Sequence, residues 1–191
     1  EEIEENEKRK IPYVVRFKIP EKVKTITWND KVRGKIEFSS DTLEDFIILK
    51  SDRWPTYNLA HIIDDHETEI SLVIRGEEFV PSTPKYILVH EAFGWQHPEY
   101  AHMPLTIGKD GKKLSKRHGD TAILDYKKKG YLPEAMLNFL VLLGWNPGEG
   151  STDEIFTKTD LEKKFSIDRV GKAPAVFDLD RLNWMNGVYI R

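Results

Sequence analysis

Short runs of β-branched and aromatic residues, separated by turn-forming residues, occupy the first part of the chain. Runs of this length, bounded by Pro, Asn, Asp and Ser, are typical of β-strands. The expected strands cover residues 13–19, 24–28, 34–38 and 45–51. We therefore predict an antiparallel β region at the start of the chain.

The hydrophobic pattern changes after Pro55, where apolar residues recur at helical spacing. A helix is predicted over residues 57–66, with Thr56 as its N-cap. The apolar run at 71–76 is short and compact, which is typical of a buried strand.

A second helix is predicted over residues 82–95. Ser82 or Thr83 can cap its start, Pro84 fits its first turn, and Gly94 fits its end. A strand over residues 100–107 follows. Strands that alternate with helices in this way predict a parallel α/β sheet.

Helical patterns dominate the chain beyond a loop that runs to residue 120. The expected helices cover 121–130, 132–145, 160–165 and 178–187. Gly187 is predicted to end the last of them, because glycine is the usual residue just past a helix. The fold class is therefore α/β: a β region, half of an α/β domain and the start of a helical domain.

Composition narrows the function classes. The chain has 191 residues, with 32 acidic and 29 basic side chains and no cysteine. The net charge of −3 excludes a uniformly basic coat for nucleic acid, but it allows a local basic site. Without cysteine there are neither disulfides nor thiolate metal sites. The longest apolar stretches fall far below the roughly 20 residues that span a bilayer. The chain starts without methionine, so we expect a piece of a longer protein.

Common catalytic and metal motifs are absent from the sequence. His61 and His66 are five residues apart, whereas a helical zinc pair needs four, so an ordinary helix contact between His61 and Asp65 is expected instead of metal. The sequence contains neither a G-x-x-x-x-G-K-[ST] phosphate loop nor a G-x-S-x-G nucleophile elbow.

The segment KKLSKRHGD at 112–120 is the strongest candidate for chemistry. Lysine suits a phosphate as a mobile point charge and arginine suits it as a fork. Glycines flank the segment, and loops that follow strands in open α/β sheets lie where ligands bind. The alternative is a solvated basic turn. The basic and hydroxyl side chains of the segment KKLSKRHGD include Lys112, Lys113, Ser115, Lys116 and Arg117.

Two further side chains allow either a structural or a functional interpretation. Arg75 ends an apolar strand, so it needs an ion-pair partner, such as Glu78 or Asp64, or a ligand. Tyr57, near the start of its helix, belongs either to the core or to a cleft that its hydroxyl enters.

Taken together, these segments resemble the class I glutamyl-tRNA synthetases. The resemblance is carried by LKSDRWPTYNLAHIIDDHE, IRGEEFVPSTPKYILVHEAFGW, HMPLTIGKDGKKLSKRHGD, LPEAMLNFLVLLGW and FDLDRLNWMNGVYIR, in the family's order and spacing. KLSKR at 113–117 occupies the place of the family's second signature, usually written KMSKS. The segments that carry the resemblance cover about two thirds of the chain.

The resemblance implies a reaction in which ATP and L-glutamate form glutamyl-adenylate, and the glutamyl group then moves to tRNA(Glu). It implies a catalytic role for Lys116 and Lys113, and it implies Mg²⁺ with the ATP. The implied ATP-binding residues are Glu78, Thr106, Lys113, Leu114, Ser115, Lys116 and Arg117. The implied glutamate-binding residues are Tyr57, His61 and Arg75, although relatives often carry asparagine in place of His61. A cytoplasmic, monomeric enzyme is expected.

The family's HIGH-type ATP signature, the first half of its nucleotide-binding fold and its anticodon-binding domain are missing from these residues. We therefore expect the C-terminal half of a Rossmann-like catalytic domain, inactive by itself. Residues 1–44 would end the inserted acceptor-binding module, 45–125 would form the second Rossmann half, and 126–191 would begin a helical stem-contact region. Zinc, which some relatives carry, is not expected without cysteine.

Three alternatives stay open. Two are related enzymes: a glutaminyl-tRNA synthetase, and the shorter paralogue that glutamylates a modified tRNA(Asp). The third is an inactive synthetase-like module that binds tRNA or a partner protein. The helical continuation beyond residue 150 and the RGEEF segment favour the glutamyl enzyme.

Overall fold

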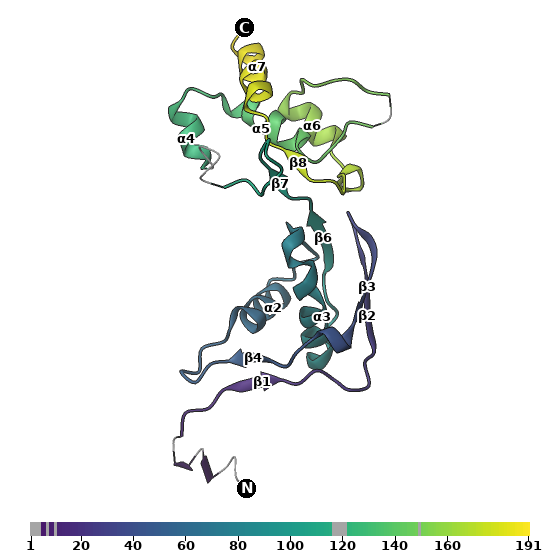
Figure 1. The fold of residues 1–191 in the computed structure, drawn as a ribbon, viewed down its shortest axis with the longest axis vertical. Coiled ribbons are helices and arrows are strands. Elements are labelled where there is room, and N and C mark those ends of the chain that lie inside the picture. Colours follow the sequence, from purple (N-terminus) through teal and green to yellow (C-terminus); the bar gives the residue numbers. More distant parts are fainter. Residues whose placement is uncertain (1–4, 7, 10, 116–121, 149) are drawn as a thin grey trace. The chain divides into compact units, whose positions relative to one another are not determined.

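The computed structural model of the chain describes residues 5–6, 8–9, 11–115, 122–148 and 150–191 (Figure 1). The chain divides into two compact units. The first unit comprises Glu1–Asp30, Gly34–Val73 and Glu78–Tyr100, and the second comprises Lys31–Arg33, Ile74–Glu77 and Ala101–Arg191.

The first unit begins with the predicted antiparallel strands, which are confirmed with shifted bounds. β1 (Val15–Phe17) pairs antiparallel with β4 (Phe46–Leu49). β2 (Thr25–Asp30) pairs antiparallel with β3 (Gly34–Ser39) along its whole length. Alternate residues of β2 are buried, as expected for a strand with one face on a core.

The predicted strand–helix alternation follows as α2 (Tyr57–Glu67), β5 (Leu72–Gly76), α3 (Thr83–Phe93) and β6 (Glu99–Met103). The strand order β3-β2-β6-β5 joins β2 to β6 in parallel at Asp30 and Tyr100. The sheet is therefore mixed. The β2–β3 hairpin of the expected antiparallel region lies in one sheet with β6 and β5 of the expected α/β part.

α3 is the most buried helix of the first unit. Ile87 and Leu88 pack with Ile26, Trp28 and Tyr100 of the sheet. Two other residues of α3, Tyr86 and Val89, pack in a second cluster with Phe46 of β4 and Ile62 of α2. Gly94 ends α3 in the left-handed conformation (φ +73°), as the sequence predicts.

The second unit contains β7 (Thr106–Ile107), which pairs in parallel with β8 (Ala175–Val176), and four helices among its described residues. The expected strand over 100–107 is thus divided into β6 and β7. Pro104 lies in the gap, and a proline cannot donate a ladder hydrogen bond. The helices are α4 (Ile123–Lys128), α5 (Pro133–Leu142), α6 (Lys158–Lys164) and α7 (Leu179–Ile190).

α7 corrects one prediction, because it continues past Gly187 to Ile190. Gly187 is not among the glycines with positive φ, so it does not act as a cap. Leu182 and Met185 of this helix pack with α5 in the core of the second unit. The described residues include no helix long and apolar enough to cross a membrane.

A buried asparagine fixes the end of α7. Asn138 is fully buried on α5, and its Oδ1 accepts hydrogen bonds from the backbone N–H of Phe156 at 2.7 Å and the hydroxyl of Tyr189 at 2.8 Å. The Tyr189 hydroxyl also lies 2.6 Å from the carbonyl oxygen of Phe156, so its single proton is shared between two acceptors. These bonds hold the last turn of α7 against α5.

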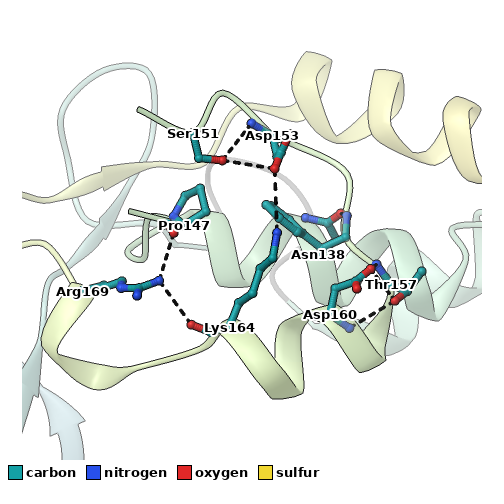
Figure 2. A network of polar contacts seen from close by, with 9 residues as sticks. Asn138, Pro147, Ser151, Asp153, Thr157, Asp160, Lys164 and Arg169 are labelled. Carbon is teal, nitrogen blue, oxygen red and sulfur yellow. Dashed lines mark hydrogen bonds and ion pairs between the residues drawn. The ribbon is translucent and has the colours of Figure 1, made fainter. Parts of the chain in front are cut away.

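Polar contacts order the connection between α5 and α6 (Figure 2). Lys164 forms an ion pair with Asp153 at 3.8 Å, and Arg169 Nη1 donates to the carbonyl of Pro147 at 2.9 Å. These two contacts tie the connection between α5 and α6 to the last residue of α6 and to the segment that follows that helix. We interpret this network as structural.

Candidate active site

Arg75 lies near the end of β5, and its side chain contacts a histidine of β6. Nε of Arg75 donates to Nε2 of His102 at 3.1 Å. Arg75 is partly exposed, whereas His102 is fully buried. The sequence suggests Glu78 or Asp64 as a structural partner for Arg75 and does not indicate His102. The signal that the sequence offers is a histidine within an otherwise apolar strand pattern, where a polar side chain needs a partner.

The backbone around His102 is fixed by a second polar pair. Arg33 Nε donates to the carbonyl of His102 at 3.3 Å, and Arg33 Nη2 pairs with Glu77. Oε1 of Glu77 in turn accepts from the N–H of Leu105 at 3.3 Å. The sequence does not indicate these contacts of Arg33 and Glu77, because they join residues far apart in the chain.

Tyr57 and His61 stack on one another at the start of α2. Their ring centroids are 4.4 Å apart with an interplanar angle of 13°, and His61 meets Tyr86 edge-on at 4.4 Å. Tyr57 is 56% exposed, so it is not a core residue. The structure therefore brings two of the three predicted glutamate-binding residues together on one helix.

The cap of α2 differs in detail from the prediction. Thr56 occupies the N-cap position, but its side chain makes no capping hydrogen bond. Its hydroxyl instead donates to the carbonyl of Ile47 at 2.9 Å, which links α2 to β4.

Glu78 lies in a 3₁₀ segment, Glu77–Ser82, and its side chain is exposed.

The start of the basic loop is an ordered turn. The N–H of Gly108 donates to the carbonyl of Lys112 at 2.8 Å, and the N–H of Leu114 donates to the carbonyl of Thr106 at 2.9 Å. Gly111 adopts φ +75°, which glycine allows without strain. The chain thus folds back on β7 and places Lys113 and Leu114 beside it. Ser115 is exposed, while Lys116 and Arg117 lie outside the described residues.

Lys109 fixes this turn to the start of α7. Its Nζ lies 2.6 Å from Oδ2 of Asp180 and 3.1 Å from Oδ1 of Asp178. These hydrogen bonds raise the pKa of Lys109, and the bond from Lys109 lowers the pKa of Asp178. Asp178 also caps α7 by accepting from the backbone N–H groups of Asp180 and Arg181. Sequence reasoning did not identify this anchor.

Leu114 turns toward the helices of the second unit. It lines a cavity of about 570 Å³ together with Lys109, Lys129 and Phe177, and a smaller apolar cavity of about 220 Å³ beside Met136. Its side chain therefore borders both cavities.

His61 and His66 pack on different aromatic partners. His66 stacks on Trp95 with ring centroids 3.8 Å apart, whereas His61 packs on Tyr57 and Tyr86. Across the described part of the chain, no three His, Cys, Asp or Glu side chains gather in a group that could hold a metal ion.

A family model described as "tRNA synthetases class I (E and Q), catalytic domain" matches residues 1–184. The chain therefore belongs to the class I tRNA synthetase family for glutamate and glutamine, and the resemblance in its sequence is confirmed.

Its relatives narrow the match to the glutamate enzymes. A glutamate–tRNA ligase from Desulforamulus reducens is 56% identical over 178 residues, which cover 93% of this chain and 36% of that protein. A glutamate–tRNA ligase from Chlorobaculum parvum is 52% identical over 181 residues, which cover 95% of this chain and 36% of that protein.

A solved structure agrees with these relatives. The crystal structure of a glutamate tRNA ligase from Elizabethkingia meningosepticum, in complex with its amino acid, matches with a TM-score of 0.90 at 40% identity. The match covers 99% of this chain and 41% of that one. This chain thus spans well under half the length of the ligases it resembles.

Proposed function

We propose that this chain is part of a glutamate–tRNA ligase, which joins L-glutamate to ATP as glutamyl-adenylate, releases pyrophosphate and transfers the glutamyl group to tRNA(Glu). The proposal is supported by the relatives named glutamate–tRNA ligase at up to 56% identity. It is supported in particular by the turn that pairs Leu114 with Thr106 and Lys113 with Ile107, because this turn leads directly into the remainder of KLSKR.

The basic loop would act on the ATP phosphates. Negative charge grows on the α-phosphate in the transition state, and lysines that reach it only then stabilise it preferentially. We assign this contact to Lys116, assisted by Lys113, Ser115 and Arg117. Glu78, Thr106 and Leu114 are assigned to the nucleotide. The Lys109 anchor gives the loop a fixed base from which the rest can close.

Arg75 would bind a carboxylate of the glutamate, because a guanidinium holds a carboxylate at two points. A contact to the side-chain carboxylate would contribute to selection of the acid over the amide, because the side chain of glutamine ends in a neutral amide. Tyr57 and His61 are assigned to the same substrate. The exposure of Tyr57 leaves its ring and hydroxyl accessible on the surface of its unit.

Mg²⁺ would enter with the ATP. We assign the ion to the ATP phosphates. ATP phosphates and waters are the ligands Mg²⁺ prefers in such sites.

The remaining expectations concern the larger protein. We propose that residues 1–44, 45–125 and 126–191 belong to the acceptor-binding module, the second Rossmann half and the helical region. On this proposal the 191-residue chain alone does not activate glutamate, and the full-length enzyme works as a cytoplasmic monomer. Contacts to tRNA would be local and would weaken with salt, because phosphate contacts release counterions.

The test is glutamate-dependent pyrophosphate–ATP exchange by a full-length protein that contains this chain, with tRNA(Glu) present. Lys116→Ala is expected to lower the rate by at least about 100-fold, since it removes a charge that acts in the transition state. Lys172→Ala, an exposed lysine outside the loop, is the matched control and should keep the wild-type rate. A Lys116→Ala variant with wild-type exchange would refute the assignment of the loop.

A further inference from the structure

We propose that His102 is a positioning residue for Arg75, and that it sets the edge of the guanidinium that meets the glutamate carboxylate. The inference rests on the proposed assignment of Arg75 to glutamate. The observation that carries it is the 3.1 Å contact between Nε of Arg75 and Nε2 of His102.

The chemistry of this contact fixes the state of the histidine. An arginine side chain only donates hydrogen bonds and stays protonated. Nε2 of His102 must therefore be the acceptor, so the ring is neutral and carries its proton on Nδ1. His102 is fully buried, and burial also favours the neutral ring. The histidine thus presents a single lone pair toward Arg75.

The acceptor is held in place by its backbone. Arg33 binds the carbonyl of His102 at 3.3 Å and pairs with Glu77, which accepts from the N–H of Leu105 three residues further on. The backbone is therefore fixed at His102 itself and at Leu105. A short, rigid ring on a fixed backbone can orient a partner more closely than a flexible side chain can.

The geometry has a consequence for substrate binding. A guanidinium can hold a carboxylate at two points, through Nε with one Nη or through its two Nη groups. Because Nε of Arg75 donates to His102, the contact favours binding of the carboxylate by the Nη1–Nη2 edge. The contact also restricts the rotation of the guanidinium plane, so the edge is oriented before glutamate arrives.

The experiment compares two amide variants of the full-length protein. His102→Gln can place an amide oxygen near the position of Nε2 and keep an acceptor for Arg75. His102→Asn is similarly polar but one methylene shorter, so its oxygen cannot reach that position. KM for glutamate, KM for ATP and kcat are measured in pyrophosphate exchange, together with the melting temperature.

We expect His102→Asn to raise KM for glutamate about tenfold, which corresponds to about 1.4 kcal/mol. KM for ATP should stay unchanged in this variant. His102→Gln should remain within about twofold of wild type, since its acceptor is retained. A merely structural role would instead shift both KM values, or would follow the melting temperature.

Two results would overturn the inference, and they are distinguishable. If Arg75→Ala raises KM for glutamate but His102→Asn does not, His102 does not position Arg75 and the assignment of Arg75 to glutamate stands. If Arg75→Ala leaves KM for glutamate unchanged, the assignment of Arg75 fails and the role of His102 fails with it.

Discussion

The Nζ atom of Lys109 lies 2.6 Å from Oδ2 of Asp180, and this contact ties the turn after β7 to the first turn of α7. Asp178 contributes a second contact at 3.1 Å and at the same time caps the helix. One lysine therefore fixes the base of the basic loop to the end of a helix.

Lys109→Ala should lower kcat in pyrophosphate exchange by roughly tenfold, because a small misplacement of catalytic groups is costly. The overall fold should be retained, since exposed ion pairs contribute little to stability. Lys158→Ala is the matched control, because Lys158 forms a similarly exposed ion pair with Glu162 on α6. Equal rates for the two variants would show that the anchor does not serve the loop.

Tyr57→Phe separates the ring of this residue from its hydroxyl. The variant keeps the stack on His61 and removes only the donor. If the hydroxyl binds the charged substrate, KM for glutamate should rise about tenfold, the usual effect of losing a hydrogen bond to a charged group. The control is Tyr13→Phe, whose hydroxyl contacts Arg53. An unchanged KM in Tyr57→Phe would limit Tyr57 to a packing role.

His90 should make the stability of the chain depend on pH. Burial lowers the pKa of this histidine below 6.5 in the folded chain, so the unfolded chain binds more protons in acid. Its contribution to stability is therefore fully present above about pH 6.5 and is lost as the pH falls toward the lowered pKa of the folded state. The charges of His97, Asp65 and His61 also act on this ring.

His90→Leu removes that titration. Urea unfolding followed by tryptophan fluorescence, at about pH 7 and about pH 5, should show a smaller loss of stability in the variant, by up to about 1.4 kcal/mol per pH unit. An identical loss in wild type and variant would mean that His90 does not titrate differently in the folded and unfolded chains.

Thr157 and Asp160 form a capping box at the start of α6. The Thr157 hydroxyl accepts from the N–H of Asp160 at 3.1 Å, and the Asp160 carboxylate accepts from the N–H of Thr157 at 3.1 Å. Thr157→Ala should destabilise α6 by about 1 kcal/mol. Hydrogen exchange of the α6 amides should therefore be faster, whereas Thr159→Ala, in the same helix but outside the cap, should change it little. Unaltered exchange in Thr157→Ala would contradict the cap.

Local signals in the sequence were sufficient for α3, because Pro84 and Gly94 fit the two ends of a helix without help from the rest of the fold. They were not sufficient for α7. Gly187 could have ended that helix, but the buried hydrogen bonds of Tyr189 to Asn138 and Phe156 hold the following turn in helical form. A glycine permits a stop, and tertiary contacts decide whether it occurs.

Among the residues of the candidate site, too, the sequence could predict some and could not predict others. Arg75 could be singled out from the sequence because a charge at the end of an apolar strand is unusual. Its partner could not, since His102 lies 27 residues further along the chain. Lys109 is 71 residues from Asp180, and no local pattern joins them. The sequence could therefore predict the residue types that carry chemistry, but not the residues that hold them in place.

The most direct test of the account is transfer of radiolabelled amino acid to tRNA(Glu) by a full-length protein that contains this chain. The account predicts that glutamate is attached, that glutamine is not, and that the 191-residue chain alone attaches neither. Attachment of glutamine in place of glutamate, or no attachment of either by the full-length protein, would contradict it.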